Sequence, residues 1–433
     1  MTLLFFWWLV AFKSGAALVV PSGTVRGTVL RTALVEDLTS DAEAVIGRVM
    51  DDVRSREAMT EEVAETIDTF LSTYLGVIED IGRDPESVVD VMREYVDMVE
   101  EQLKAPFKFE PLHRAATEPV DYYAMDTSFM EPLIDMEDSV VLGAEFVAEI
   151  TKQLEKGENV VLLSNHQTEA DPSAWSALFD RGDDSWRDES FAKRMIMVAG
   201  DRVTTDPVAV PFSKARNLLC IYSKRHIDKP PEMKRAKQLH NTKTMGAMLK
   251  LLADGGNMIW VAPSGGRDRP DTAGDFSKPA FFDAKSVEMF RIMANKVGIF
   301  KKTHFWPTAM LTYRLFPPPP QVSTGGLGEP RIAMRGSVNA CFGPELNFDQ
   351  EVVVPDDPAA WPEGCADAKD AARALAAAYA YDACKEAYDR LLEAATARGS
   401  PYYSAEARKL NAEKVLAEYE KAPANNNPAA PKK

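Results

Sequence analysis

Cysteine is scarce in this sequence. The 433 residues include only Cys220, Cys341, Cys365 and Cys384, and no two of them stand in a CxxC pair. Zinc sites built on cysteine depend on such closely spaced pairs, so a zinc site is not expected. Cys220 and Cys341 lie in apolar runs, which favours reduced core residues in a reducing compartment. We expect neither a metal ion nor a cofactor.

Positive charge is also in short supply. Lys and Arg number 50 against 66 Asp and Glu, which gives a net charge of −16 and a pI of about 5.0. A nucleic-acid-binding protein needs a basic surface to neutralise phosphates, so that class is disfavoured. One segment reverses the balance: residues 213–250 hold ten Lys or Arg against two acids. This segment either steers an acidic partner to the protein or forms a solvated helix face.

Long hydrophobic runs are absent as well. The longest, "LLFFWWLVAF" (3–12), is shorter than the roughly 20 residues that span a bilayer, and no stable membrane insertion is expected. Small residues follow it, and then a stretch rich in Thr and Arg without an acid until Glu36. The pattern is typical of a targeting leader over residues 1–35; a membrane-surface anchor or a disordered leader are the alternatives.

Several familiar catalytic motifs are missing. The sequence contains no GxSxG, no Walker A motif, no HExxH and no dinucleotide-type GxGxxG. Serine hydrolases with a nucleophile elbow, P-loop nucleotidases, zinc peptidases and Rossmann dehydrogenases therefore lose support.

Two kinds of periodicity are present. Residues 36–105 carry apolar side chains at spacings of three and four, which predicts a small helical bundle. From 106 to 400 the pattern of apolar residues changes. Short runs that are apolar on both faces appear there, with helical segments at 231–256 and 365–399. These runs predict an α/β domain with a buried, largely parallel sheet flanked by helices. A C-terminal helix and a disordered tail are expected in 401–433. The runs are "NVVLLS" (159–164), "MIMVAG" (195–200), "NLLCIYS" (217–223), "NMIWVA" (257–262), "WPTAMLT" (306–312) and "IAMRGSVNACFG" (332–343).

Polar side chains follow the predicted strands at the points where they end. His166 follows the first strand, Lys224, Arg225 and His226 follow the third, and the fourth leads into "PSGGRDR". In open α/β sheets, ligands bind outside the carboxyl ends of the strands. If the strands are parallel, these loops converge on one edge of the sheet, and that convergence is a stronger signal than any single motif.

His166 and Asp171 are the candidate catalytic pair. Histidine is the side chain best suited to act as a base near neutral pH, and it needs a carboxylate on its other ring nitrogen to fix the tautomer. An Asp at the start of the next helix can reach a His at a strand end. The simpler interpretation is that Asp171 is a helix N-cap ahead of Pro172 and that His166 is an ordinary loop histidine.

Arg267 and Arg269 are candidate phosphate ligands, because guanidinium groups bind phosphate in a bidentate manner. A solvated turn is the alternative. Arg225 and His226 could close the other side of a phosphate, or belong to a surface charge run.

Six blocks in this order resemble the soluble glycerol-3-phosphate acyltransferase family of plastids, over roughly residues 40–400. The blocks are "EPVDYYAM" (118–125), "NVVLLSNHQTEADP" (159–172), "VAGDRVTTDP" (198–207), "PFSKARNLLCIYSKRHI" (211–227), "WVAPSGGRDRPD" (260–271) and "GPELNF" (343–348).

The resemblance implies a small N-terminal helical domain beside a larger α/β domain with a mixed sheet. It implies transfer of a fatty acyl chain from acyl-acyl carrier protein, or acyl-CoA, to the sn-1 hydroxyl of glycerol 3-phosphate, giving lysophosphatidate. The family's base and its carboxylate fall on His166 and Asp171, and its phosphate clamp on Arg225, His226, Arg267 and Arg269. The first clamp position is typically Lys, so either Arg225 or the adjacent Lys224 makes that contact.

No Ser or Cys nucleophile is placed for an acyl-enzyme, so we expect direct transfer. The basic segment 213–250 is the expected docking region for acyl carrier protein, and a monomer is expected. The leader resembles a bipartite signal and transit peptide of an alga, and the catalytic region a chloroplast stromal enzyme. Two alternatives stay open: acylation of lysophosphatidate at sn-2, and a non-catalytic lipid-carrier or scaffold protein of the same fold. The lack of membrane spans disfavours the first, and the intact His166–Asp171 pair and arginine loop disfavour the second.

Overall fold

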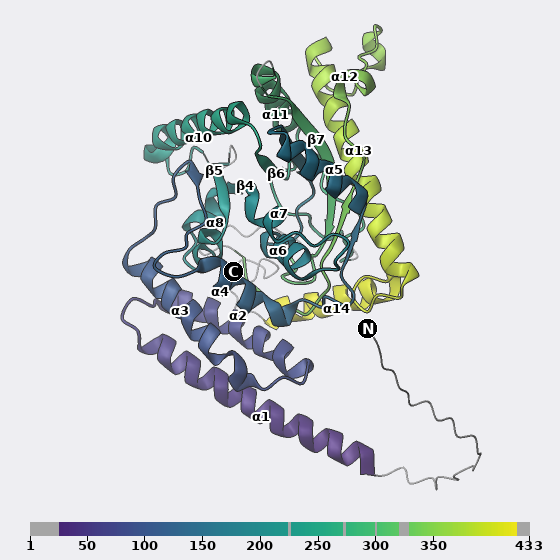
Figure 1. Cartoon of the computed structure of the whole chain (residues 1–433). Helices are drawn as coiled ribbons and strands as arrows, with labels where there is room; N and C mark the ends of the chain where they lie inside the picture. Colours follow the sequence, from purple (N-terminus) through teal and green to yellow (C-terminus); the bar gives the residue numbers. More distant parts are fainter. Residues whose placement is uncertain (1–25, 224–226, 272–273, 299–300, 320–328, 422–433) are drawn as a thin grey trace, which may run out of the picture.

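The computed structural model describes residues 26–223, 227–271, 274–298, 301–319 and 329–421. Helices cover both faces of one mixed sheet, and three N-terminal helices pack below it (Figure 1). The strands are β1 (Leu112–His113), β2 (Val140–Leu142), β3 (Asn159–Ser164), β4 (Met195–Gly200), β5 (Asn217–Ile221), β6 (Met258–Val261), β7 (Thr303–Leu311) and β8 (Asn339–Phe342).

The strand order across the sheet is β1-β5-β4-β6-β3-β7-β8-β2. The five central strands, from β5 to β7, are mutually parallel. Antiparallel pairing occurs where β1 joins β5 and where β8 joins β7. The prediction of a mixed, largely parallel sheet flanked by helices is confirmed, and the carboxyl ends of β3, β4, β5, β6 and β7 share one edge.

Both faces of the sheet are buried because successive side chains of a strand point to opposite faces. In β3, Val160 and Leu162 join the core under α4 to α7, whereas Val161 and Leu163 join the core under α10, α11 and α13. The helices on the first side are α4 (Tyr122–Met130), η2 (Glu131–Leu133), α5 (Ala144–Glu155), α6 (Asp171–Arg181), α7 (Glu189–Arg194), α8 (Asp201–Thr205) and α9 (Val210–Lys214). The later helices are η3 (Pro231–Met233), α10 (Lys234–Asp254), α11 (Ala284–Val297), α12 (Phe348–Glu351), η4 (Pro358–Ala360), α13 (Ala368–Ala397) and α14 (Ala405–Lys421).

The strand expected over 332–343 is shorter than predicted. Only Asn339–Phe342 pairs with β7. Earlier in the segment, the backbone N–H of Ala333 donates to the Thr73 hydroxyl of α2, and the N–H of Met334 donates to the Leu315 carbonyl. These groups are therefore committed to contacts outside the sheet. The short strands β1 and β2 were not predicted, since two or three residues carry no readable alternation.

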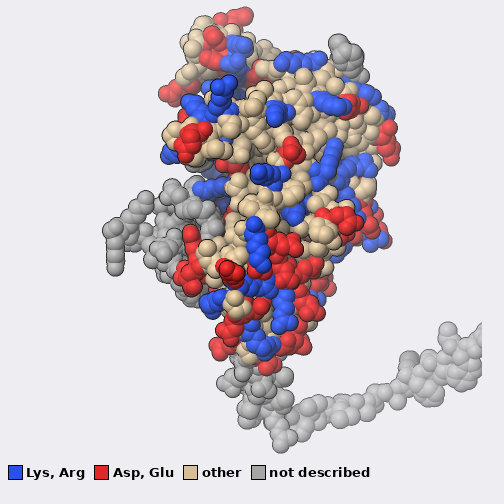
Figure 2. Space-filling view, turned by 90° about the vertical axis from the view of Figure 1, so that its left-hand side faces the viewer, with Lys and Arg blue, Asp and Glu red and all other residues tan. Residues whose placement is uncertain are grey.

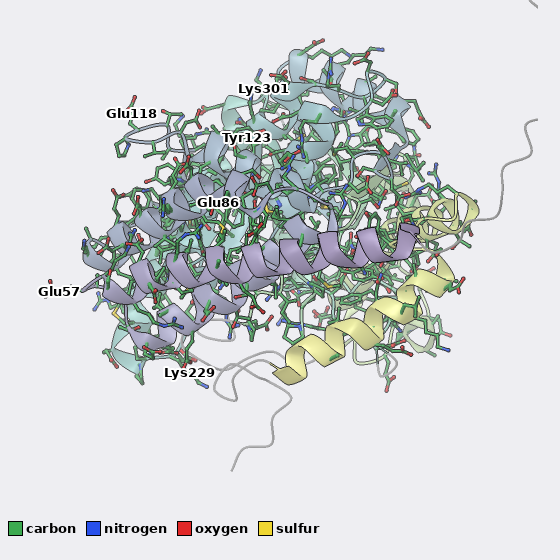
Figure 3. All side chains as sticks on the ribbon, turned by 90° about the horizontal axis from the view of Figure 1, so that it is seen from below. Glu57, Glu86, Glu118, Tyr123, Lys229 and Lys301 are labelled. Carbon is green, nitrogen blue, oxygen red and sulfur yellow. The ribbon has the colours of Figure 1, made fainter. Side chains whose placement is uncertain are left out.

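The N-terminal helices are α1 (Arg26–Ser55), α2 (Glu61–Asp80), η1 (Pro85–Val88) and α3 (Val89–Lys104). Helix α1 runs through the expected boundary at residues 35 and 36, and crosses the underside of the molecule, where Arg48 pairs with Glu86 (Figure 3). The core of α1–α3 continues into α4 and α6 as one cluster.

Tyr95 of α3 illustrates the junction between the N-terminal helices and the rest. Its ring contacts Phe129 of α4 and Phe212 of α9, at centroid distances of 5.3 and 5.4 Å. Its hydroxyl donates to the Val208 carbonyl at 3.1 Å. The hydrophobic core is therefore continuous across residue 105, where the sequence pattern changes.

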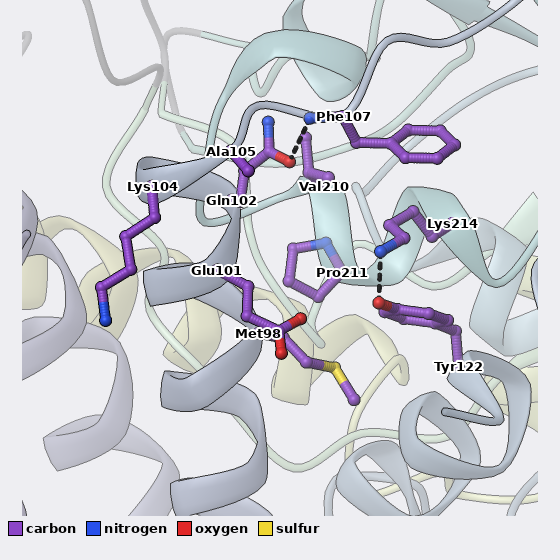
Figure 4. Close-up of a pocket in the computed structure, with 10 residues that line it drawn as sticks. All are labelled: Met98, Glu101, Gln102, Lys104, Ala105, Phe107, Tyr122, Val210, Pro211 and Lys214. Carbon is purple, nitrogen blue, oxygen red and sulfur yellow. Dashed lines mark hydrogen bonds between the residues drawn. The ribbon is translucent and has the colours of Figure 1, made fainter. Parts of the chain in front are cut away.

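A pocket of about 270 Å³ opens where α3 meets α4 and α9 (Figure 4). Lys214 lies inside it, with its Nζ 3.9 Å from the centre of the Tyr122 ring and 5.1 Å from that of Phe107. None of the candidate site residues that the structure describes lines this pocket. Within the described ranges, no helix combines the length and apolar character needed to cross a membrane.

Candidate active site

Asn165 fixes the carboxyl end of β3. Its side chain is fully buried; the amide nitrogen donates to the Met310 carbonyl at 3.0 Å and to Asp268 Oδ2 at 2.9 Å. Its amide oxygen accepts from the Met310 N–H at 2.7 Å. Because β3 is thereby tied to β7 and to the loop after β6, His166, the next residue, is held at the sheet edge.

His166 and Asp171 are in contact. His166 Nδ1 lies 2.7 Å from Asp171 Oδ2, and the ring is a quarter exposed while Asp171 is fully buried. With Nδ1 donating to the carboxylate, Nε2 carries the lone pair and can accept a proton. Among the described residues Nε2 has no hydrogen-bond partner, and Trp260 stacks edge-on to the ring at 5.6 Å. A histidine held in this way can act as a general base.

The capping interpretation of Asp171 is wrong. Ala170 is the N-cap residue of α6, without a side-chain bond, and Asp171 is the first residue of the helix. Its Oδ2 accepts from the backbone N–H of Gln167 at 2.7 Å and of Thr168 at 3.3 Å, and its Oδ1 from the Thr312 hydroxyl at 2.5 Å. The carboxylate thus binds the loop that precedes the helix, because that loop folds back over it.

The loop after β6 lies against the loop after β3, as the parallel sheet predicts. The backbone N–H of Asp268 donates to the His166 carbonyl at 2.6 Å. The Asp268 side chain is buried, and burial raises its pKa from 3.8 to about 6, although hydrogen bonds from Ala280 N–H and Asn165 oppose the shift. Asp268 therefore binds the two loops together beside His166.

Arg267 and Arg269, the predicted phosphate ligands, both contact the carboxylate of Glu329. Arg269 Nη2 lies 2.8 Å from Oε1 and Nη1 lies 3.0 Å from Oε2, while Arg267 Nη2 pairs with Oε2. Arg267 also lies 3.5 Å from Glu169 Oε1. The structure therefore brings the two arginines together, onto a shared carboxylate.

Glu169 connects this pair to a third arginine. Burial would raise its pKa, but Arg331 and Arg267 outweigh burial and lower it to about 2. Arg331 Nε lies 2.8 Å from Glu169, and its Nη2 lies 2.8 Å from Asp206, which follows α8. A string of alternating charges thus runs along the carboxyl edge of the sheet.

The sequence reasoning missed Trp260, Glu169, Glu329 and Arg331. Glu169 lies inside the His166–Asp171 segment, and Trp260 lies inside a predicted strand. The sequence therefore indicated their location near the site but not the contacts that they make. Glu329 and Arg331 lie some 60 residues beyond the arginine loop and carry no local signal. Arg225 and His226 lie outside the described residues. No group of three metal-ligating side chains occurs within the described part of the chain.

The basic segment 213–250 divides between interior and surface. Arg216 is buried against Asp126, and Lys237 is buried as well. Lys229, Lys234, Arg235, Lys243 and Lys250 are exposed, four of them on α10. On the face shown in Figure 2, cations predominate in the upper part and acidic side chains are dense in the lower part.

Comparison with known proteins gives one family and a group of relatives. Residues 145–310 match the Acyltransferase family. The chain is 39% identical over 267 residues to "Glycerol-3-phosphate acyltransferase, chloroplastic" of Arabidopsis thaliana, covering 62% of this chain and 56% of that protein. The protein of the same name from Pisum sativum is 37% identical over 310 residues, 71% of this chain and 64% of the relative. The matches thus span less than two thirds of the length of these relatives.

Proposed function

We propose that this protein is a plastid glycerol-3-phosphate 1-O-acyltransferase. It transfers a fatty acyl chain from acyl-acyl carrier protein, or acyl-CoA, to the sn-1 hydroxyl of glycerol 3-phosphate, and the product is lysophosphatidate. The observation that carries the proposal is the contact of His166 with the buried Asp171, beside a loop with two converging arginines. The similarity to chloroplastic glycerol-3-phosphate acyltransferases supports the same reaction.

In the proposed mechanism His166 Nε2 takes the proton of the sn-1 hydroxyl as the oxygen attacks the thioester carbonyl. Asp171 holds the proton on Nδ1 and stabilises the imidazolium that forms. The tetrahedral intermediate then expels the thiolate, and His166 Nε2 gives its proton to the departing sulfur. The C–S bond breaks, the ester C–O bond forms, and His166 returns neutral.

Direct transfer is favoured over an acyl-enzyme. Burial raises the pKa of Cys220 to about 12 and that of Cys341 to about 11, and it raises the pKa of Cys384 further. A thiol is nucleophilic as the thiolate, so these three cysteines are poorly suited to accept an acyl group.

Arg267 and Arg269 are proposed to hold the phosphate, with Arg225 and His226 from the loop after β5. A phosphate fixed at one end of glycerol 3-phosphate sets the position of the sn-1 hydroxyl relative to His166. Arg267→Ala should raise KM for glycerol 3-phosphate by about tenfold or more, because a charged hydrogen-bonding partner is lost. An unchanged KM would remove Arg267 from the phosphate site.

An acyl-transfer assay with two acceptors and two donors tests the activity. Glycerol 3-phosphate should be acylated at sn-1 and lysophosphatidate left unreacted. Acylation of lysophosphatidate alone would support the sn-2 activity, and no transfer to either acceptor would support a non-catalytic role. The donor arms compare acyl-acyl carrier protein with acyl-CoA of the same chain.

The acidic carrier protein is proposed to dock on the exposed cations of α10. Arg235 and Lys243 are both exposed on this helix. Reversing both, as Arg235→Glu with Lys243→Glu, should raise KM for acyl-acyl carrier protein more than KM for acyl-CoA. Lys285→Glu, at an exposed position of α11, is the matched control and should affect neither donor. Equal effects on the two donors would place docking elsewhere.

The plastid location also belongs to the proposal. The relatives are named chloroplastic, and the N-terminal pattern resembles a bipartite leader of an algal plastid protein. Residues 1–25 lie outside the described residues. Imaging of the leader fused to a fluorescent protein, in a cell whose plastid has extra bounding membranes, tests this location.

A further inference from the structure

Glu329 is a deeply buried carboxylate beside the candidate site. Only 1% of its side chain is exposed, yet it is ion-paired with two arginines from the loop after β6. The two guanidinium groups converge on a single atom, Oε2, through Arg267 Nη2 and Arg269 Nη1. An anion held by both arginines would have to place an oxygen at that position.

Glu329 also occupies donors that a phosphate would need. Arg269 donates from Nη1 and Nη2 to the two carboxylate oxygens of Glu329. Its Nη1 also donates to the Pro319 carbonyl at 2.7 Å. This end-on geometry is the bidentate arrangement that guanidinium groups form with carboxylate or phosphate. The carboxylate is thus bound as a phosphate would be bound.

Three arginines face three carboxylates in the described part of this cluster. Within the described ranges, Arg267, Arg269 and Arg331 face the carboxylates of Glu169, Glu329 and Asp206 in direct ion pairs. Adding a phosphate dianion beside these carboxylates would place like charges together in a buried setting, which costs free energy unless one leaves. Glu169 and Asp206 are held by Arg331, and Glu329 is the carboxylate that Arg267 and Arg269 share. Its departure would open a position on both arginines, with Arg267 still 3.5 Å from Glu169.

We propose that Glu329 is a resident carboxylate ligand of the phosphate site, displaced from Arg267 and Arg269 when the substrate phosphate binds. The inference rests on the proposed function, because it takes the two arginines to be phosphate ligands. Glu329 is a specificity-determining residue in this scheme and not a catalytic one, since the bound acceptor replaces it and it takes no part in acyl transfer.

Displacement makes the site selective. The carboxylate is part of the chain, so it competes at a high effective concentration that weak anions in solution do not match. A phosphate dianion brings more charge and more acceptor oxygens than one carboxylate, and can therefore replace it. Acceptors without a phosphate would leave Glu329 in place and the site closed to them.

The test compares phosphate binding in Glu329→Gln and in the unsubstituted protein. Glutamine keeps the size of the side chain and removes the competing charge. Calorimetry with inorganic phosphate should give a Kd about tenfold lower in the variant, because the arginines are available for a larger fraction of the time. KM for glycerol 3-phosphate should fall in parallel. Phosphate should also raise Tm more in the variant, since it restores charge pairing to the two arginines.

The control is Glu131→Gln, which removes the same charge from an exposed pair with Arg83 and should leave Kd, KM and Tm shifts unchanged. Equal phosphate affinity in the Glu329→Gln and unsubstituted proteins would overturn the inference. Weaker phosphate binding in that variant would also overturn it, and would make Glu329 a group that positions the arginines. If Arg267→Ala leaves KM for glycerol 3-phosphate unchanged, the proposed phosphate site itself fails.

A crystal structure of the unsubstituted protein with inorganic phosphate gives a second test that does not depend on how the variant folds. Phosphate oxygens are expected on Arg267 and Arg269, with the Glu329 side chain rotated away from them. Phosphate bound while Glu329 keeps both arginine contacts would overturn the inference. Phosphate absent from both arginines would contradict the proposed function.

Discussion

Two histidines lie at opposite ends of the same pair of parallel strands, and each is held by carboxylates. His166 follows the carboxyl end of β3 and contacts Asp171 through Nδ1 alone. His304 lies near the amino end of β7, opposite Val160 of β3, with Nδ1 2.7 Å from Glu345 and Nε2 3.1 Å from Glu158.

The difference between the two histidines is access to the second nitrogen. His304 is 3% exposed and both of its nitrogens face carboxylates, at the wall of a polar pocket of about 510 Å³. Its ring has no lone pair to offer a substrate in this arrangement. It ties β7 to the loop before β3 and to the loop after β8. A carboxylate beside a histidine therefore does not by itself identify a base, because the second ring nitrogen must also be accessible to a substrate.

The largest expected effect is on catalysis at His166. His166→Ala should lower kcat by about 10²–10⁴-fold, because the proton acceptor is lost, while calorimetric binding of glycerol 3-phosphate stays nearly intact. Steady-state kinetics and calorimetry on the same preparation measure both. Retained turnover in His166→Ala would mean that His166 is not the base, and the two histidines would then not differ in function.

A smaller loss is expected at the carboxylate that orients His166. Asp171→Asn keeps an oxygen for Nδ1–H but removes the charge that stabilises the imidazolium. We expect kcat to fall about 10²-fold, with little change in KM for glycerol 3-phosphate. A change confined to KM would mean that Asp171 shapes the acceptor site and does not assist the base.

Two other carboxylates near the histidines should respond to pH with opposite signs. The pKa of Asp268 is raised to about 6 by burial, so the folded protein holds a proton that the unfolded chain releases near pH 4. The contribution of Asp268 to the free energy of unfolding therefore falls by about 3 kcal/mol as pH rises from about 4 to about 6. The pKa of Glu345 is lowered, because its bond to His304 and that residue's charge outweigh burial, so its contribution is lost as pH falls.

Urea unfolding of Asp268→Asn and Glu345→Gln at pH 4 and pH 7 measures this contrast. Relative to the unsubstituted protein, Asp268→Asn should gain stability toward neutral pH, and Glu345→Gln should lose it. The same trend in both variants would contradict the assigned causes of the two shifts.

The smallest effect is expected at His304. His304→Gln should lower the free energy of unfolding by about 1–2 kcal/mol, because hydrogen bonds to two carboxylates are lost or weakened. The kcat should stay within about twofold of the unsubstituted value, as the ring lies at the amino edge of the sheet. A large fall in kcat with unchanged stability would reverse the comparison.

The sequence was informative wherever a signal was local. Strand β3 and the positions of His166 and Asp171 follow from a single run of residues, and the parallel order of the central strands brought the loop of Arg267 to the same edge. His304 shows the limit: it lies just before the predicted strand 306–312, in the part of β7 that the sequence pattern missed, and its partners Glu158 and Glu345 come from two other segments. Glu329 was missed for the same reason, since its ion pairs join residues about 60 positions apart in a loop without periodicity.

The Asp171 cap shows another limit. The residues Asp171 and Pro172 fit the start of a helix, and the helix does begin there, but the carboxylate bonds to Gln167 and Thr168 on its other side. The residue pattern located the helix start correctly. It assigned the Asp171 carboxylate to the N–H groups of the helix and not to those of the preceding loop, because a loop that folds back leaves no pattern in the sequence.

The continuous core across residue 105 makes the N-terminal helices and the sheet one cooperative unit. Tyr95 joins the two parts, with Phe129 and Phe212 around its ring and its hydroxyl on the Val208 carbonyl. When such a contact surface is shared, separating the parts exposes apolar area from both sides. The chain should therefore melt in a single transition, and its two halves should each lose solubility when produced alone.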